Sequence, residues 1–281
     1  MRRKMLKIFP DSIYLTIQYL YLNGAFLNLL RPQTFNEKLN WLKINDRTRL
    51  HTICADKVLV KEFVSEKIGE QYVIPTYHVI DKCSDLTIEK LSTKPCMVKA
   101  NHDSGTTFCV DQFNLSENYF NHIKLTLESA MSQNYYWAGR EWQYKDIKPK
   151  ILIEELLESS DQEFLLDYKV FVFNGVAKFI QVDTDKPEFH KINLYDRNWE
   201  FVPVQIVYPN DMKLIERPVL LDKMLELSEV LAQPFKFVRI DWYISDNRLF
   251  VGEMTFHPSS GMVPFKPKSM NRLFGDCLDI Q

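Results

Sequence analysis

A tight turn between two apolar runs constrains the fold more than any other feature of the sequence. Asn174-Gly175 divides the largely apolar segment 168–182 into two halves. Asn-Gly is the pair that a two-residue hairpin turn favours, because both positions need a positive φ. The halves are therefore expected to pair as antiparallel strands and to begin a sheet. The segments 235–244 and 249–255 predict a second hairpin in the same half of the chain.

Helical and extended patterns precede these hairpins. Thr34-Phe-Asn-Glu37 is a capping box, which predicts the start of a helix. The chain is predicted to be an α+β protein with a helical N-terminal segment, 1–50, and two lobes, 51–150 and 151–281. Other helices are expected from Asp11 or Ser12 to Leu22, at 55–68, at 116–133 and from Pro218, and strands at 72–80, 96–100 and 151–155.

The charge balance excludes one class of partner. The 281 residues include 35 Lys and Arg against 37 Asp and Glu, a net charge of -2, so no overall positive field could hold a nucleic acid. The five cysteines form no C-x-x-C pair, which argues against a disulfide framework and against a structural zinc site. We therefore expect a protein of a reducing cytoplasm that binds no nucleic acid.

The N-terminus combines basic and apolar residues. The first seven residues and the apolar pair that follows them resemble the start of a secretion signal, but Pro10 and Asp11 interrupt the pattern. The stretch 8–30 is too polar for a membrane span. We expect a buried helix here in a cytoplasmic protein, and peripheral docking at the inner membrane is the alternative.

The second predicted hairpin brings charged residues together. Arg239 and Asp241 lie two residues apart and so share a strand face, as do Glu253 and Thr255. With a three-residue loop, Asp241 faces Glu253 across the ladder, and two carboxylates this close repel unless a cation lies between them. Oxygen ligands at this spacing suit Mg²⁺. The alternative is a solvated sheet face on which the acids pair with Arg239 and Arg248.

Two lysines adjoin candidate phosphate-binding segments. Lys99 ends a predicted strand before the loop 102–107, whose small and hydroxyl residues could direct backbone N–H groups at phosphates. The loop lacks the G-x-x-x-x-G-K-[ST] pattern, and Ser104-Gly105 alone also fits an ordinary turn. Lys57 lies near a predicted helix start, where a lysine is usually solvated.

Taken in this order, these features resemble the ATP-grasp superfamily, in which two α+β lobes with mainly antiparallel sheets clasp ATP. The resemblance covers residues 51–261 and implies an adenine hinge at 153–157. Asp167 stands where the superfamily has its ribose-binding carboxylate, and Lys169 shares a strand face with Asp167 and so points into the same space. The implied ATP contacts are Lys57, Lys99, Ser104, Gly105, Glu154, Glu155, Leu157, Asp167 and Lys169.

The same resemblance implies one or two Mg²⁺ ions. Their implied ligands are Asp241, Glu253 and Thr255, and the implied catalytic residues are Arg239 and Lys99. Thr255 stands where the superfamily has Asn, so it offers a neutral oxygen or nothing. Asp103 puts an acid in the phosphate loop, which is unfavourable beside a triphosphate unless it faces away or binds an amine substrate.

Longer matches narrow the resemblance to the TupA-like ATP-grasp proteins of polysaccharide biosynthesis. This implies a ligase that joins an amino acid or another amine, through an acylphosphate, to a uronic acid of a surface polysaccharide of the capsule or O-antigen type, or of its precursor. Either substrate could supply the carboxylate. The matching segments include 31–39, 55–57, 101–102, 140–142, 167–169, 195–196 and 252–261.

Five residues of these segments and of the predicted cleft are candidate substrate contacts. A packed or capping role is equally open for four of them, whereas the Arg140 guanidinium suits bidentate recognition of a carboxylate. The candidates are His102, Arg140, Lys191, His257 and Ser260.

Three other functions stay open. Asp183-Thr-Asp185 is a D-x-D sequence of the kind that glycosyltransferases use, although no Rossmann-like series of parallel strands precedes it. An ATP-grasp kinase that phosphorylates a sugar hydroxyl is the second. The third is a non-catalytic binding subunit, against which the complete set Lys57, Lys99, Arg239, Asp241 and Glu253 counts.

Overall fold

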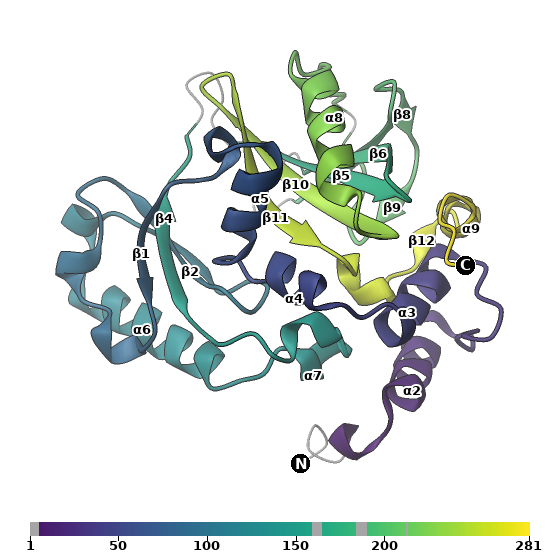
Figure 1. Cartoon of the computed structure of the whole chain (residues 1–281), viewed down its shortest axis with the longest axis horizontal. Coiled ribbons are helices and arrows are strands. Elements are labelled where there is room, and N and C mark those ends of the chain that lie inside the picture. Colours follow the sequence, from purple (N-terminus) through teal and green to yellow (C-terminus); the bar gives the residue numbers. More distant parts are fainter. Residues whose placement is uncertain (1–5, 159–164, 184–189, 212) are drawn as a thin grey trace.

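Two antiparallel sheets form the framework of the protein (Figure 1). The computed structural model describes residues 6–158, 165–183, 190–211 and 213–281. The predicted α+β class with mainly antiparallel sheets is confirmed. The four strands of the first sheet are, in spatial order, β1 (Thr76–Ile80), β4 (Ile151–Glu155), β2 (Cys96–Ala100) and β3 (Thr107–Val110).

The second sheet is built around the two predicted hairpins. Asn174 and Gly175 both have positive φ, of 47° and 80°, and form the first hairpin turn as the sequence predicts. A separate pair of short strands, β9 (Gln205–Ile206) and β12 (Phe265–Lys266), lies outside this sheet. The six strands are, in spatial order, β11 (Arg248–Thr255), β10 (Phe237–Ser245), β5 (Asp167–Phe173), β6 (Val176–Asp183), β7 (Ile192–Asp196) and β8 (Phe201–Val202).

The predicted helical N-terminal segment is present. The Thr34 hydroxyl accepts from the Glu37 N–H, and the Glu37 carboxylate accepts from the Thr34 N–H, so the capping box is confirmed. Asp11 begins its helix but does not cap it, and the helix expected from Pro218 begins at Leu221. The helices are α2 (Asp11–Asn23), α3 (Phe35–Asn45), α4 (Arg49–Ala55), α5 (Val60–Ile68), α6 (Glu117–Met131), α7 (Tyr136–Gly139), α8 (Leu221–Ala232) and α9 (Ser269–Asp276).

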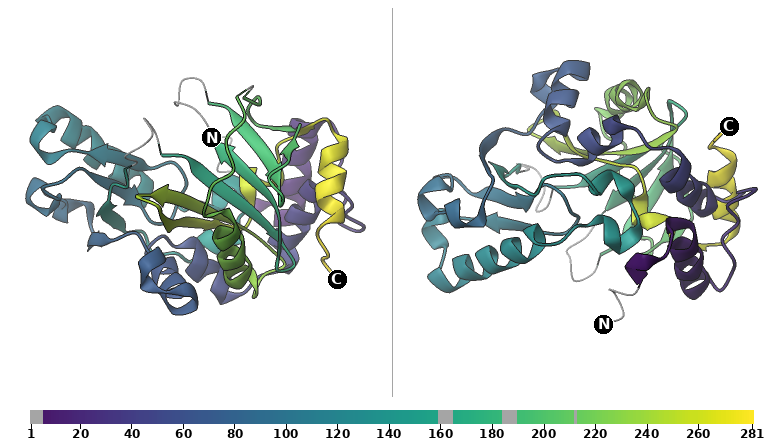
Figure 2. Two further views of the ribbon diagram at one scale, coloured as in Figure 1. Left: turned by 90° about the horizontal axis from the view of Figure 1, so that it is seen from above. Right: turned by 60° about the horizontal axis from the view of Figure 1, so that its bottom comes forward.

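The long helix α6 covers the first sheet (Figure 2). The Ser116 hydroxyl accepts a hydrogen bond from the Tyr119 N–H at 3.2 Å and so starts the helix. Phe120, Ile123 and Leu127 recur at helical spacing and are buried against apolar residues of β2 and β4. This amphipathic pattern is what predicted the helix from the sequence.

The two faces of the second sheet pack against different helices. On one face Ile240 and its neighbours pack with α8, α4 and α5. On the other face the alternate residues Phe171, Phe173 and Phe237 pack against α3 and α9. Further along the same strands this second face carries Lys169 instead of phenylalanine, paired across the sheet with an acidic residue of β10. One half of the face therefore belongs to the core and the other half presents charge.

The chain crosses between the two sheets at different residues from the expected boundaries. β4 pairs with β1 and β2, so the first sheet extends to Glu155, beyond residue 150. Phe63 and Val64 of α5 join the core beneath α8, although this helix precedes β1 in the chain. Over the residues that the structure describes, no helix has both the length and the apolar character to cross a bilayer.

A cluster of phenylalanine rings attaches α9 to the second sheet. Phe274 is fully buried and stacks on Phe179 with centroids 4.2 Å apart, and it also contacts Phe265 at 5.3 Å. Aromatic pairs of this kind add to the burial of apolar area.

Replacing Phe274 with Ala should therefore destabilise the protein strongly. The loss of a buried ring and the cavity that it leaves predict a decrease of about 3–5 kcal/mol in the free energy of unfolding, measured by urea denaturation. Leu273→Ala, in the same helix at a side chain that is 44% exposed, is the matched control and should cost less than about 1 kcal/mol. Equal losses in the two variants would contradict this account.

Candidate active site

A bulge in the last hairpin positions the candidate metal ligands. Asp246 and Asn247, with φ of 49° and 58°, form a two-residue turn instead of the three-residue loop on which the predicted pairing depended. A regular ladder from this turn would place Gly252 opposite Asp241. The register shifts by one residue at Gly252, so Asp241 pairs with Glu253 as the sequence analysis expected, by a different route.

Arg239 binds both oxygens of Asp241. Its Nε and Nη2 donate to the two carboxylate oxygens at 2.7 and 2.5 Å. The same Nη2 lies 3.4 Å from Glu253 and 3.2 Å from the Thr255 hydroxyl, which itself donates to Glu253 at 2.9 Å. The sequence analysis placed Arg239 and Asp241 on one face of their strand, and Glu253 and Thr255 on one face of the next. In the structure these four side chains form a single hydrogen-bonded group.

The charges of this group perturb each other. Burial raises the pKa of Asp241 well above its usual value, and the Glu253 and Asp167 carboxylates add to this increase while Arg239 opposes it. Partial burial also raises the pKa of Glu253, but the positive charges of Lys57 and Arg239 outweigh it and lower that pKa to about 2. The two carboxylates thus differ, because the Lys57 charge acts on Glu253, whereas burial and two neighbouring carboxylates raise the pKa of Asp241.

A second charged group adjoins the first across the sheet. Lys169 pairs with Asp241 in the β5–β10 register, and its ammonium lies 2.8 Å from Asp167 and also binds Asp183. One buried oxygen of Asp167 has no hydrogen-bond partner among the described residues. Burial raises the pKa of Asp167, and the Asp183 charge adds to this increase while Lys169 opposes it. His190 approaches Asp183 at 3.3 Å from the edge of the group.

The Glu154 carboxylate, in strand β4 of the first sheet, binds two lysines. Lys99 and Lys61 lie 2.5 and 2.7 Å from its two oxygens. Burial raises the pKa of Glu154, but the two ammonium groups outweigh it and lower the pKa below its usual value. The carboxylate that was expected to contact adenine is therefore occupied in orienting Lys99, and Lys61 was not expected at the site.

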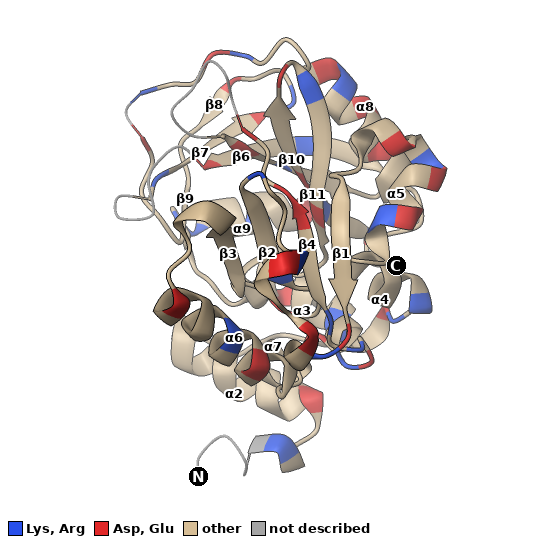
Figure 3. Cartoon of the chain, turned by 90° about the vertical axis from the view of Figure 1, so that its left-hand side faces the viewer, with Lys and Arg blue, Asp and Glu red and all other residues tan. Residues whose placement is uncertain are grey.

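The Asn101 side chain ties the segment around Lys57 to the end of β2. Its amide donates to the Asp56 carboxylate at 2.9 Å, and its oxygen accepts from the Lys150 N–H at 2.7 Å. The Lys57 N–H donates to the Asn101 carbonyl at 3.1 Å. These bonds hold Lys57 at a small cavity that Lys99 lines from the first sheet and Gly252 lines from the second, and the Lys57 charge acts on Glu253. Figure 3 views the molecule with the first sheet in front.

The loop after β2 turns its acid away from its exposed tip. Ser104 and Gly105 are exposed, whereas Asp103 is buried, with one oxygen bound by the Thr106 hydroxyl at 2.6 Å. The Lys57 ammonium donates to the Asp103 carbonyl and closes the loop from the other side. The other carboxylate oxygen of Asp103 is buried without a partner among the described residues.

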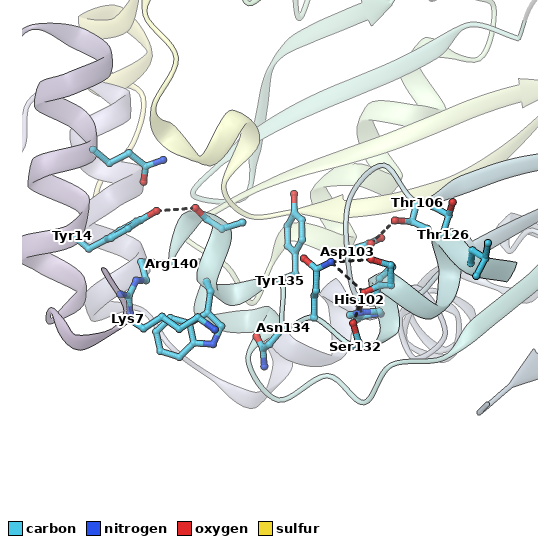
Figure 4. Close-up of a pocket in the computed structure, with 17 residues that line it drawn as sticks. Lys7, Tyr14, His102, Asp103, Thr106, Thr126, Ser132, Asn134, Tyr135 and Arg140 are labelled. Carbon is cyan, nitrogen blue, oxygen red and sulfur yellow. Dashed lines mark hydrogen bonds between the residues drawn. The ribbon is translucent and has the colours of Figure 1, made fainter. Parts of the chain in front are cut away.

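A cavity of about 980 Å³ opens beside this loop (Figure 4). Its walls come from α2, the C-terminal half of α6, the segment around α7, and the loop itself. His102 and Asp103 each present a buried side-chain atom without a partner among the described residues. Burial and the Glu141, Asp103 and Glu253 charges raise the pKa of Tyr135 to about 12, so this tyrosine of the cavity wall stays protonated between the cavity and Glu253.

Two of the candidate substrate residues lie away from the hairpin group. Arg140 lines the far end of the cavity, where it lies 3.1 Å from Asp11 and stacks over Tyr14 and Trp137. Lys191 lies 3.4 Å from Asp211 beside β7.

Two further candidates, His257 and Ser260, contribute to the packing of the loop after β11. The His257 Nδ1 lies 3.1 Å from the Gln143 amide, and burial lowers the pKa of His257 well below its usual value. The buried Lys43 donates to the Ser260 carbonyl at 2.7 Å and to the Ser260 hydroxyl at 2.8 Å. These contacts fix the loop against α3.

A second cavity, of about 490 Å³, lies at the end of β4. Glu155 and Leu157 line it from the first sheet, and Ser245 and Phe250 line it from the last hairpin. The residues of the predicted hinge therefore face a space between the two halves of the molecule.

The described part of the chain contains no group of three His, Cys, Asp or Glu side chains arranged to hold a metal by themselves. Asp241 and Glu253 are a pair, and Thr255 adds a neutral oxygen. A divalent ion here would need further oxygen ligands from water or from a bound phosphate.

Some residues of the site were not expected from the sequence. Lys61 lies one helical turn after Lys57, a spacing that could have indicated it. Asp183 was considered only as part of a D-x-D sequence, whose other members, Thr184 and Asp185, lie outside the described residues. The position of Tyr135 in the cavity wall, where the Glu253 charge acts on it, depends on tertiary structure and has no local signal in the sequence.

A family model described as TupA-like ATPgrasp matches residues 37–279. No curated protein matches the sequence. Among solved structures, D-alanine–D-alanine ligase from Bacillus anthracis complexed with ATP is 17% identical, with a TM-score of 0.45, over 73% of this chain and 55% of its own. ATP-grasp ligase PsnB complexed with its minimal precursor is 11% identical, with a TM-score of 0.43, over 82% of this chain and 58% of its own.

N5-Carboxyaminoimidazole synthetase from Staphylococcus aureus complexed with ADP is 15% identical, with a TM-score of 0.39, over 72% of this chain and 43% of its own. The chain thus spans about half the length of these solved proteins. The family model, by contrast, matches most of the chain, from within α3 to three residues beyond α9. On that match, the protein belongs to the TupA-like ATP-grasp family.

Proposed function

We propose that this protein is an ATP-dependent ligase that joins a carboxylate to an amine through an acylphosphate. One observation carries the proposal. The hairpin holds Asp241 and Glu253 directly opposite each other beside Arg239, and Lys57 lies close enough for its charge to act on Glu253. Paired acids and convergent cations of this kind suit the transfer of a phosphoryl group. Membership of an ATP-grasp family supports the same chemistry.

The described residues fit ATP between the two sheets. The cavity at Glu155 and Leu157 would take the adenine, and the exposed amides of Ser104 and Gly105 would cover the phosphates. Lys57, Lys99 and Lys169 would neutralise the phosphate charge. The bonds of Lys99 to Glu154 and of Lys169 to Asp167 hold these ammonium groups in place before the nucleotide binds.

The donor set also fits Mg²⁺ once phosphate oxygens complete it. Asp241 and Glu253 would be the protein ligands, with the Thr255 hydroxyl beside them. Burial and the neighbouring carboxylates raise the pKa of Asp241, and a cation bound between Asp241 and Glu253 would offset the repulsion between them. When bound, the ion would offset the charge of the phosphates. One or two ions are compatible with these ligands.

The chain's own residues account for the rest of the chemistry. A substrate carboxylate attacks the γ-phosphorus, and the bond to the β-phosphate oxygen breaks to release ADP. The amine then attacks the acyl carbon, loses a proton and displaces phosphate. Arg239, fixed beside the acids, would stabilise the oxyanion and the departing phosphate, and Lys99 would stabilise the transferred group. No protein nucleophile is needed.

We assign the carboxylate substrate and the amine substrate to the cavity beside the loop after β2. Its volume of about 980 Å³ suits a sugar acid together with an amino acid, and aromatic walls at Tyr14 and Trp137 suit sugar rings. The unpartnered oxygen of Asp103 would bind the ammonium group of the amine substrate, and His102 would bind beside it. Arg140, which lines the far end of this cavity, would contact the bound substrate. We propose a uronic acid of a surface polysaccharide, or of its precursor, as the sugar.

The decisive experiment measures ADP release from ATP and Mg²⁺ across a panel of uronic acids and amino acids. Release that requires both a carboxylate and an amine, and that stops when EDTA removes the metal, is the expected result. Hydroxylamine should trap the acylphosphate. Phosphorylation of a sugar hydroxyl without a trapped acylphosphate would indicate a kinase instead, and release of UDP from a sugar nucleotide would indicate a glycosyltransferase.

Asp241→Asn should weaken Mg²⁺-dependent binding of ATP. The substitution keeps the shape of the side chain but removes the charge that a metal requires, so calorimetry should show a dissociation constant at least about tenfold higher. Asp222→Asn, in α8 at a side chain that is 80% exposed, is the matched control and should bind ATP like the parent protein. Unchanged affinity in Asp241→Asn would refute its role as a ligand.

Asp103→Asn should raise the KM for the amine substrate by about tenfold, because a hydrogen bond to a charged group is replaced by one to a neutral group. The affinity for ATP should stay the same, because the buried side chain of Asp103 does not belong to the exposed tip of the loop. Asp85→Asn is an exposed control in the same half of the chain. An unchanged KM for the amine would remove Asp103 from the substrate site.

A further inference from the structure

The N-terminal helix exposes an apolar face that no described part of the chain covers. Ile13, Ile17, Leu20 and Tyr21 recur at i, i+4, i+7 and i+8 and so form one stripe along α2. Their exposed fractions are 45%, 49%, 39% and 86%. The segment after the helix continues this surface with Phe26, which is 75% exposed, and Leu30, which is 95% exposed. We call these six residues the α2 surface.

The other sides of α2 are already in use. Leu15 and Tyr19 are buried in a small core with Leu27 and Met262. Tyr14 and Gln18 line the cavity of about 980 Å³. Figure 1 shows α2 at the periphery of the molecule, with only one side turned towards α3. A helix that needed only to pack on its own protein would carry polar residues on its outer side, so the α2 surface indicates an external partner.

The charge of this part of the chain indicates which partner. The first 36 residues contain five basic residues and one acid, whereas the whole chain has 35 basic and 37 acidic residues. The single acid, Asp11, lies 2.7 Å from Arg47 and 3.1 Å from Arg140 and presents little free negative charge. Lys7 and Arg31 lie at the two ends of the apolar segment in the sequence.

We propose that the α2 surface docks in the interface of a bilayer that contains anionic lipids. Apolar side chains that enter the acyl boundary, together with flanking lysine and arginine that meet acidic headgroups, are the recognised design of a helix lying in the membrane plane. A second copy of this chain fits less well, because a two-fold contact would bring two basic segments together. The inference does not depend on the ligase proposal, since it concerns binding alone.

The test is co-sedimentation of the full chain with vesicles. We expect the protein to sediment with phosphatidylcholine vesicles that contain about 30 mol% phosphatidylglycerol, to bind much less to phosphatidylcholine alone, and to be released as salt screens the basic residues. Ile17→Asp should reduce the bound fraction at least about tenfold, because it puts a charge into the centre of the apolar stripe. Tyr21→Asp, at a side chain that is 86% exposed, repeats the test where a folding defect is least expected.

Val219→Asp is the matched control. This residue is 89% exposed, lies in the segment before α8, and undergoes the same change of charge outside the α2 surface, so its binding should equal that of the parent protein. The proposal is wrong if the parent protein does not sediment with anionic vesicles, or if Ile17→Asp and Tyr21→Asp sediment as well as the control does. A dimer that Ile17→Asp dissociates, without vesicle binding by the parent, would overturn it in favour of a second copy.

Discussion

The repulsion between two carboxylates held face to face governs the organisation of this protein. Asp241 and Glu253 are cross-strand neighbours, and like charges in that position destabilise a sheet unless cations compensate for them. Arg239 supplies the nearest positive charge from the same strand, and Lys169 supplies another from the next strand. Lys57 supplies a third from a segment that precedes the first sheet. Both halves of the molecule therefore supply positive charges that compensate for these two carboxylates.

The connection between the halves depends on buried polar side chains. Asn101 has no exposed surface. Its side chain bonds to Asp56 and to Lys150, the residue before β4, and so fixes the loop after β2 relative to Lys57. Glu154 fixes Lys99 in the same way. A satisfied buried amide or carboxylate is strongly directional, so these groups define position where apolar packing would leave freedom. The side chains of the candidate site are therefore held in position by the protein's own hydrogen bonds.

The sequence predicted the parts of the structure that depend on local chemistry. The Asn174-Gly175 hairpin, the capping box at Thr34 and the amphipathic α6 were all predicted from residue spacing and are confirmed. Arg239 and Asp241 were expected together because residues two apart in a strand point to the same face. The actual turn and bulge could not be deduced from this alternation, which does not define the length of the turn.

Contacts between distant segments could not be predicted in this way. Arg140 suited a substrate carboxylate in isolation, but it lies beside Asp11, which is more than a hundred residues away. Lys61 and Asp183 join the charged groups only because β4, α5 and β6 converge in space. The roles of the site residues in catalysis stay predictions until variants are measured.

The division of one sheet face into an aromatic half and a charged half has a consequence for how this fold can evolve. The acids at the charged half oppose folding, as the raised pKa values of Asp167 and Asp241 indicate. The phenylalanine half offsets that opposition, since Phe173 is buried in one of the same strands and Phe274 of α9 packs against it. A lineage that no longer needed the reaction could gain stability by neutralising these acids. The charged half of the face is therefore the place where single neutral substitutions could make this fold more stable.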